Sequence, residues 1–205
     1  MTVIYEDNHI IIVAKRSGEI VQGDKTGDQP LSETVKQYIK EAYAKPGKVF
    51  LGVVHRLCKM FAGGEVHKTY WAVVSQMPPR QEGTLVSWLV RNEKQNKSYA
   101  YDHEVRNSKR AELDYRLIGR SDRYYLLEVV LKTGRHHQIR CQLAQMGCPI
   151  KGDLKYGAKR SNPDGSICLH ARKIQFIHPV SKKQIVAEAP VPNGNLWNSF
   201  KLANR

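Results

Sequence analysis

Short strand-forming segments dominate this chain, and they restrict its possible folds more than any other feature of the sequence. Residues 67–74 are rich in β-branched and aromatic side chains, which favour a strand. Residues 112–118 and 124–131 predict neighbouring strands joined across residues 119–123. The other predicted strands are one or two at 3–14, around a turn at 6–8, and a final hairpin at 173–177 and 184–189, around residues 179–181. We therefore predict an α+β fold with a mixed, mostly antiparallel sheet flanked by a few helices and loops.

Two segments have the apolar spacing of amphipathic helices. Residues 31–43 carry apolar side chains three or four residues apart, Pro30 suits the first helical turn, and Pro46-Gly47 ends the helix. Residues 136–146 show the same spacing over a shorter length. By contrast, the glycine-rich residues 18–27 predict a loop, and the polar, charged residues 94–102 predict a hairpin tip or loop.

The chain is strongly basic. Its 205 residues include 33 Lys and Arg against 19 Asp and Glu, so its net charge is +14 and its isoelectric point is near 9.7. This balance favours a protein that binds a polyanion, nucleic acid first and an anionic membrane second. The alternative is a soluble protein that is basic but has no such partner. No apolar run approaches the roughly 20 residues that cross a bilayer, and the first residues lack the pattern of a signal peptide. We expect a cytoplasmic protein with no membrane partner.

The cysteines do not indicate a metal site. Cys58, Cys141, Cys148 and Cys168 form no C-x-x-C pair, which is the usual spacing in a structural zinc site. His170 could join the last three around a metal, but their spacing matches no familiar ligand pattern. We expect no bound metal, and we expect the thiols to be reduced and structural, as is usual in a cytosolic chain.

Residues 133–140, Thr-Gly-Arg-His-His-Gln-Ile-Arg, follow a predicted strand and open a predicted helix. A turn at Gly134 would gather basic side chains, among them Arg135 and His136, and free backbone N–H groups at a helix N-terminus. A phosphate or a carboxylate is favoured at such a place. The alternative is the solvated, basic first turn of an ordinary helix.

Residues 67–71 interleave basic and aromatic side chains on a predicted strand. Alternation along the strand places Lys68 and Tyr70 on one face and Thr69 and Trp71 on the other. Aromatic rings can stack on unpaired bases while cations hold phosphates. Alternatively the strand is half buried and its aromatic rings belong to the core, which we expect of Trp71 more than of Tyr70.

The glycine-flanked loop at residues 151–157 is also basic. Its Lys155 could contact a nucleic-acid backbone, or the loop could serve only as a tight connector. Other basic residues fall mostly in predicted loops and are expected to form a solvated surface; they are Lys94, Lys97, Arg106, Lys109, Arg110, Lys182 and Lys183.

Several segments match, in order, the motifs of one enzyme family. They are residues 4–9 followed by Lys15, His55-Arg56-Leu57 as the start of an H-R-L-D motif, residues 68–70 as a K-x-Y strand, residues 134–140 as a G-R-x-H-Q-I-R helix start, residues 152–157 as a G-D-x-x-Y-G loop, and residues 169–171 with 178–179 as an L-H-A … H-P strand. The family that the chain resembles is the RluA-like pseudouridine synthases. The likeness covers nearly the whole chain. It implies the pseudouridine synthase fold in a single domain over residues 1–205, without the separate N-terminal RNA-binding domain of some relatives.

The resemblance implies cofactor-free isomerisation of uridine to pseudouridine in structured RNA, ribosomal or transfer RNA, by a monomer. The target uridine is flipped out of its stack, and the Asp of H-R-L-D acts as the nucleophile. By motif match Tyr70 packs against the uracil, and Arg140 pairs with the catalytic Asp and holds it ionised. Ile139 and Leu169 line the pocket. The expected RNA contacts are Arg56, Lys68, Arg135, His136 and Lys155.

At the nucleophile position the chain departs from the family, because Cys58 stands where the motif has Asp. The family also has a turn, a strand and a helix between H-R-L-D and K-x-Y, whereas here only residues 58–67 separate the two motifs. The join resembles an excision after Leu57. Loss of a core strand and helix would expose apolar surface to water, at a cost of about 25 cal/mol per Å². Summed over the exposed area, this cost would exceed the small net free energy of unfolding of a domain.

Three hypotheses explain this departure. The sequence omits a segment that the protein has, which we favour, or the chain is a degenerate relative that binds RNA without catalysis. In the third, the thiolate of Cys58 is the nucleophile. A thiolate can add to an electron-poor pyrimidine ring, but it offers one reactive atom and cannot form a bidentate pair with Arg140. We predict no pseudouridine formation by the chain as it stands.

Overall fold

The computed structural model describes residues 1–16, 18–23, 28–53 and 66–202 and separates into two compact units at Leu57. Arg56 and Cys58 lie outside these residues, and so does the junction that follows Leu57. None of the helices in the described part has the length and apolar character that crossing a membrane requires.

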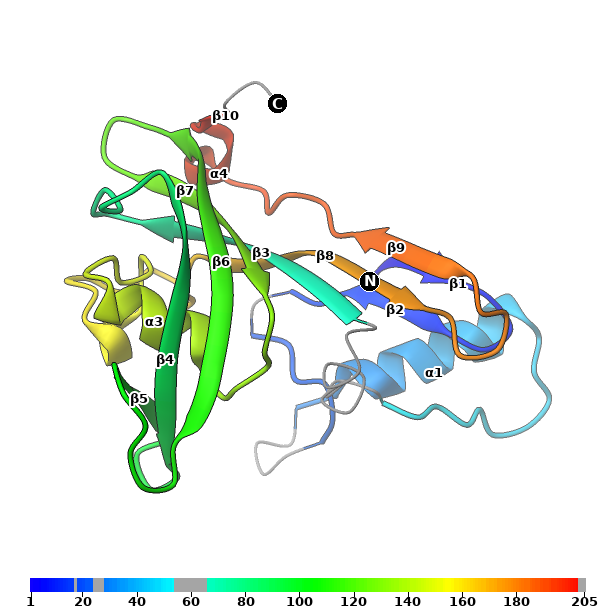
Figure 1. The fold of residues 1–205 in the computed structure, drawn as a ribbon. Coiled ribbons are helices and arrows are strands. Elements are labelled where there is room, and N and C mark those ends of the chain that lie inside the picture. The colour runs from blue at the N-terminus through cyan, green and yellow to red at the C-terminus, as the bar shows by residue number, and fades with distance from the viewer. Residues whose placement is uncertain (17, 24–27, 54–65, 203–205) are drawn as a thin grey trace. The chain divides into compact units, whose positions relative to one another are not determined.

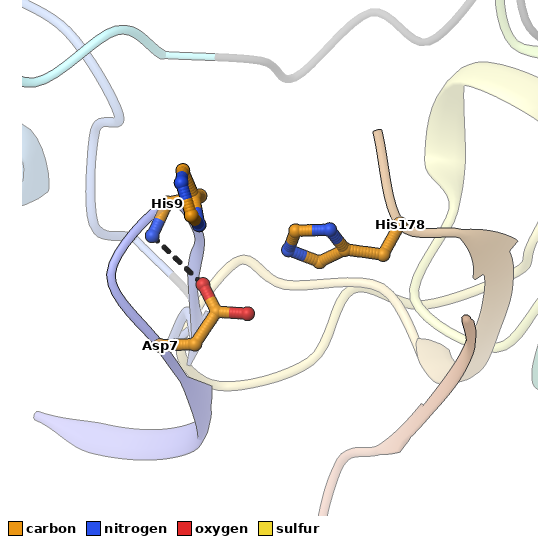
Figure 2. A group of neighbouring side chains, drawn as sticks. All are labelled: Asp7, His9 and His178. Atoms are coloured by element: carbon orange, nitrogen blue, oxygen red, sulfur yellow. Dashed lines mark hydrogen bonds between the residues drawn. The ribbon is translucent and has the colours of Figure 1, made fainter. Parts of the chain in front are cut away.

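In its described residues, the first unit consists of a two-stranded sheet and a helix (Figure 1). β1 (Thr2–Glu6) and β2 (Ile11–Ala14) pair antiparallel, with the predicted turn between them. The turn is closed by Asp7, whose carboxylate accepts the backbone N–H of His9 at 2.8 Å (Figure 2). The predicted helix is α1 (Leu31–Ala42), which begins after Pro30.

The second unit is built on one antiparallel sheet (Figure 1). Its strands follow the order β5-β4-β6-β7-β3-β8-β9, and β10 pairs with β6. The strands are β3 (Val66–Val74), β4 (Glu82–Asn92), β5 (Lys97–Tyr101), β6 (Lys109–Arg120), β7 (Tyr125–Leu131), β8 (Leu169–Ile177), β9 (Gln184–Glu188) and β10 (Lys201–Leu202). Every pairing that the structure describes is antiparallel, so the predicted mostly antiparallel sheet is confirmed.

The predicted final hairpin is formed by β8 and β9. His178 closes the turn that follows β8. Its Nδ1 accepts the backbone N–H groups of Val180 at 3.1 Å and Ser181 at 2.9 Å. The ring of His178 is drawn in Figure 2.

The core of the second unit lies where α3 (Gln138–Gln145) packs on the sheet (Figure 1). Leu113, Leu127, Val129 and Leu143 have 0% exposure and belong to one cluster. The side chains on β6 and β7 come from alternate positions, so they point to one face of the sheet. A short 3-10 helix, η1 (Leu154–Tyr156), follows α3, and α4 (Asn195–Asn198) precedes β10.

The prediction of a hairpin tip or loop at residues 94–102 is wrong over most of that range. The tip is residues 93–96, and residues 97–101 form β5, the edge strand beside β4, which was not predicted. The sequence of β5 lacks the usual alternation of a strand, in which apolar side chains face inward and polar side chains face outward. Here a small polar residue faces inward and aromatic residues face outward. Ser98 is 2% exposed, whereas Tyr99 is 38% and Tyr101 is 40% exposed.

Candidate functional site

The first turn of α3 is held against β6 by the side chain of Gln138. Its amide oxygen accepts the backbone N–H of Arg135 at 3.0 Å and the hydroxyl of Thr133 at 2.8 Å. Its amide nitrogen donates to the carbonyl of Glu112 at 3.0 Å. Because Gln138 is only 3% exposed, these bonds are shielded from water and fix the loop before the helix. His137 then turns the chain into the helix with a left-handed φ of 51°.

Arg140 on α3 forms a bidentate ion pair with Asp153, the residue before η1. Arg140 Nε donates to Asp153 Oδ2 at 2.6 Å, and Nη2 donates to Oδ1 at 2.7 Å. The side chain of Asp153 is 1% exposed and that of Arg140 is 18% exposed, so solvent screens the pair little. The resemblance assigns Arg140 to the Asp of H-R-L-D instead. Since position 58 lies outside the described residues, that assignment stays a prediction.

The hydrogen bonds around His137 specify which of its ring nitrogens carries the proton. Arg140 Nη1 lies 3.0 Å from His137 Nε2, and arginine can only donate, so Nε2 accepts. In the neutral ring the proton is then on Nδ1, which donates to the hydroxyl oxygen of Tyr156 at 3.1 Å. Burial and the charge of Arg140 lower the pKa of His137 to about 4, so the ring is neutral at pH 7.

We expect His137 to make the stability of the protein depend on pH. The ordinary His pKa is 6.5, whereas His137 takes up its proton in the folded state only near pH 4. Its contribution is therefore fully present above pH 6.5 and is lost as the pH falls toward 4, by about 1–2 kcal/mol after allowance for partial exposure of the ring. Urea unfolding of wild type and His137→Gln, near neutral pH and near the folded pKa, measures this. An equal loss of stability in both proteins would contradict the assignment.

The residues expected to line a uridine pocket lie in one core cluster. Ile139 is 5% exposed, and Tyr70 and Leu169 are partly buried against the same cluster. They come from α3, β3 and β8, which are far apart in the sequence. Burial raises the pKa of Tyr70, so its hydroxyl stays protonated and its ring is suited to packing against a neutral base. Trp71 is buried and belongs to the core cluster, as expected.

Two of the expected RNA contacts, His136 and Lys155, hold the tip of the β4–β5 hairpin. The Lys155 ammonium donates to the carbonyl oxygens of Gln95 at 3.3 Å and Asn96 at 3.2 Å. The ring of His136 lies 3.0 Å from the Oγ of Ser98 and 3.1 Å from the Oδ1 of Asn96. These bonds place the hairpin tip beside the N-terminus of α3.

The other expected RNA contacts have different surroundings. Arg135 is exposed, and its Nε donates to the carbonyl of Arg110 at 3.1 Å. Lys68 is partly buried on β3. Arg56 lies outside the described residues. For all of these residues, contact with RNA stays a prediction.

The three described cysteines are buried and free. Cys141 Sγ donates to the carbonyl of Ser98 at 3.2 Å, and Cys168 Sγ accepts the amide N–H of Asn162 at 3.3 Å. Burial raises the pKa of Cys141 to about 11 and also raises that of Cys148. Cys141 and Cys148 therefore stay protonated at pH 7, which suits the structural role expected of them.

Three residues of this hydrogen-bond network were not predicted from the sequence: His137, Asp153 and Tyr156. A signal was present, because Asp153 is the one acidic residue of a loop that was considered for its lysines. The loop also requires its glycine. Gly152 has a φ of 88°, and a Cβ at this position would lie 2.5 Å from the carbonyl oxygen of Ser166.

Comparison with known proteins identifies relatives of one kind. Residues 51–145 match the family model described as RNA pseudouridylate synthase. The chain is 31% identical to a ribosomal large subunit pseudouridine synthase D from Xanthomonas campestris, over 94% of this chain and 66% of that protein. It is 27% identical to an uncharacterized RNA pseudouridine synthase from Chlorobaculum parvum, over 94% and 71%. Among solved structures, human RNA pseudouridylate synthase domain containing 4 aligns with a TM-score of 0.76 at 18% identity, over 99% of this chain and 95% of that one.

The curated relatives are longer than the part of this chain that they match. The chain spans about two thirds of their length, 66% of the Xanthomonas protein and 71% of the Chlorobaculum protein. The match to the Xanthomonas protein runs over 226 positions, whereas 94% of 205 residues is about 193, so about 33 positions have no counterpart in this chain. This deficit is larger than the roughly 17 residues of one average helix and one average strand together.

Proposed function

The chain belongs to the RNA pseudouridine synthase family, and on that premise we propose that it binds structured RNA and holds an unstacked uridine for isomerisation to pseudouridine. The uracil packs on Tyr70, between Ile139 and Leu169, and Arg140 provides the adjacent cation. Ribosomal RNA is the first candidate substrate, because the Xanthomonas relative is named for the large ribosomal subunit. Transfer RNA is the second.

The observation that carries this proposal is the fixed guanidinium of Arg140. A guanidinium has five N–H donors, and in the described part of the chain Asp153 and His137 engage three of them. Two donors remain for a further acceptor. A second carboxylate, such as the nucleophile of the family, suits these donors in charge and in geometry. The pair with Asp153 holds the guanidinium in place before that acceptor arrives, which reduces the cost of ordering the site.

A second candidate function is RNA binding without catalysis on the same fold. Two observations favour it: Cys58 at the nucleophile position and the shortfall of about 33 positions against the Xanthomonas relative. Both candidates require the basic surface and the uridine pocket. They differ only in whether pseudouridine is formed, so an isomerisation assay separates them.

We expect RNA binding to weaken steeply with salt. Each phosphate contact releases counterions and contributes a slope of about −0.7 to −0.9 to log K against log salt concentration. Five contacts would then weaken binding by roughly 100- to 500-fold between about 50 and 200 mM salt. Fluorescence anisotropy with ribosomal RNA fragments and with transfer RNA measures the slope and the preferred RNA. Binding that does not respond to salt would count against both candidate functions.

A further inference from the structure

A pocket of about 530 Å³ opens between β5, α3 and η1. We call it the β5 pocket. Its lining includes Lys97 and Tyr99 from β5, Lys155 and Tyr156 from η1, and Cys141 from α3, and it contains no carboxylate. The pocket is shallow and open to solvent, so it suits a base and a phosphate that lie on the protein surface and not an enclosed ligand. A positive, partly aromatic pocket of this size suits an anionic ligand that has a flat ring.

Of the two lysines that line the pocket, Lys155 donates to the carbonyls of the hairpin tip, whereas Lys97 faces two aromatic rings. Its ammonium lies 5.3 Å from the ring centroid of Tyr99 and 5.3 Å from that of Tyr156. Since no carboxylate lines the pocket, the charge of Lys97 is available to a phosphate.

Tyr99 is positioned to stack on a base. It is 38% exposed, and its hydroxyl donates to the Oε1 of Gln95 at 2.5 Å, which restricts the ring. A ring that is already fixed loses little conformational freedom when a ligand stacks on it. Base stacking on an aromatic side chain is worth roughly 5- to 150-fold in affinity, whichever base is stacked.

The β5 pocket lies next to Arg140, the cation that the proposed function assigns to the uridine site. The ring of Tyr156, which lines the pocket, also has the guanidinium of Arg140 at 4.9 Å from its centroid. One aromatic ring therefore separates Lys97 from Arg140. Two nucleotides that lie close together along one RNA strand could occupy the two places at once.

The pocket is suited to binding and not to a second reaction. Its thiol, Cys141, has a pKa raised by burial to about 11 and donates its proton to the carbonyl of Ser98. A protonated, hydrogen-bonded thiol is a poor nucleophile at pH 7. The other groups that carry the argument are lysines and tyrosines.

We propose that the β5 pocket binds a second unstacked nucleotide of the same RNA, with its base on Tyr99 and its phosphate on Lys97. This inference rests on the proposed function, because it adds a second point of contact for the same RNA. It predicts a preference for single-stranded over fully paired RNA, since only an unpaired base can enter the pocket.

Binding of a short oligouridine, followed by fluorescence anisotropy, tests the proposal. Tyr99→Ala weakens binding by roughly 10-fold, whereas Tyr99→Phe retains the ring and binds like wild type. Lys97→Ala lowers the salt slope by about 1. Tyr101→Ala is the matched control, because Tyr101 is on the same strand, is 40% exposed and does not line the pocket. All four substitutions are on an edge strand, and urea unfolding checks that each variant remains folded.

The outcomes separate this inference from the proposed function. If wild type binds neither oligouridine nor structured RNA, both fail. If wild type binds RNA and Tyr99→Ala behaves like Tyr101→Ala, only the inference fails. Competition adds a further arm: uridine 5′-monophosphate that displaces the RNA better than inorganic phosphate from wild type, with this advantage reduced in Tyr99→Ala, supports a nucleotide site in the β5 pocket. Equal displacement by the two would reduce the pocket to an anion site and overturn the role of Tyr99.

Discussion

Asp153→Ala lowers the free energy of unfolding by about 3–5 kcal/mol, because it leaves the charge of Arg140 without its partner in a largely buried place. The pair is bidentate, and the side chain of Asp153 is 1% exposed. The loss should also release His137, whose Nε2 accepts from the same guanidinium. Urea unfolding monitored by circular dichroism measures the change.

Asp114→Ala is the matched control. Asp114 forms an ion pair with Lys132 at 2.9 Å, but its side chain is 41% exposed, so its loss should cost no more than about 1 kcal/mol. The double variant Arg140→Met/Asp153→Leu should recover most of the stability lost in Asp153→Ala, since it leaves no unpaired charge. If Asp153→Ala and Asp114→Ala cost the same, the pair does not stabilise the fold in the way described.

If the 205-residue sequence is the whole protein, we expect it to form no pseudouridine in ribosomal or transfer RNA, so that the second candidate function, RNA binding without catalysis, would hold. This is the largest functional effect that we expect, because the family reaction needs a carboxylate where this chain has Cys58. A cysteine offers one reactive atom, and its ordinary pKa of about 8.5 leaves it mostly protonated at pH 7. Incubation with RNA, followed by digestion to nucleosides and chromatography, detects the product. The Xanthomonas relative, tested on the same RNA, is the comparison enzyme.

Two results would change this conclusion. Turnover that disappears in Cys58→Ala would make the thiolate the nucleophile. An intact mass well above 23.4 kDa, with a peptide that continues from Leu57 into Asp, would supply the missing carboxylate and restore the first candidate function. A mass equal to that of the chain, with RNA binding and no product, would support the non-catalytic relative.

The predictions from sequence succeed where residues of one segment share one environment. Residues 67–74 and 124–131 are predicted almost to the residue, because β3 and β7 lie in the middle of the sheet and carry dense apolar side chains. Residues 31–43 are predicted as well, because α1 buries Leu31 and Val35 one turn apart. β5 is missed because an edge strand is half solvated, so its composition resembles that of a loop.

The residues of the candidate site also differ in how well they could be predicted from local sequence. Tyr70, Ile139 and Leu169 each lie in a short motif, and in the structure they belong to or pack against one core cluster, while their contact with a uridine stays a prediction. The pairing of Arg140 with Asp153 was not predicted, although the loop that contains Asp153 was considered for its lysines. The sequence does not indicate the direction in which the Asp153 side chain points. The resemblance instead assigns position 58 as the partner of Arg140.

Local composition and motif order therefore establish the family, the strand-rich fold and the basic charge, because each can be read within one segment or summed along the chain. The Arg140–Asp153 pair and the β5 pocket arise only from packing. Arg140 and Asp153 are 13 positions apart in the sequence, and their Nε and Oδ2 atoms lie 2.6 Å apart. Lys155, which lines the pocket, donates to the carbonyl of Asn96, 59 positions away, at 3.2 Å. Contacts at that separation depend on how the β4–β5 hairpin, α3 and η1 come together, and this is decided by the burial of their apolar faces and not by any one of the segments.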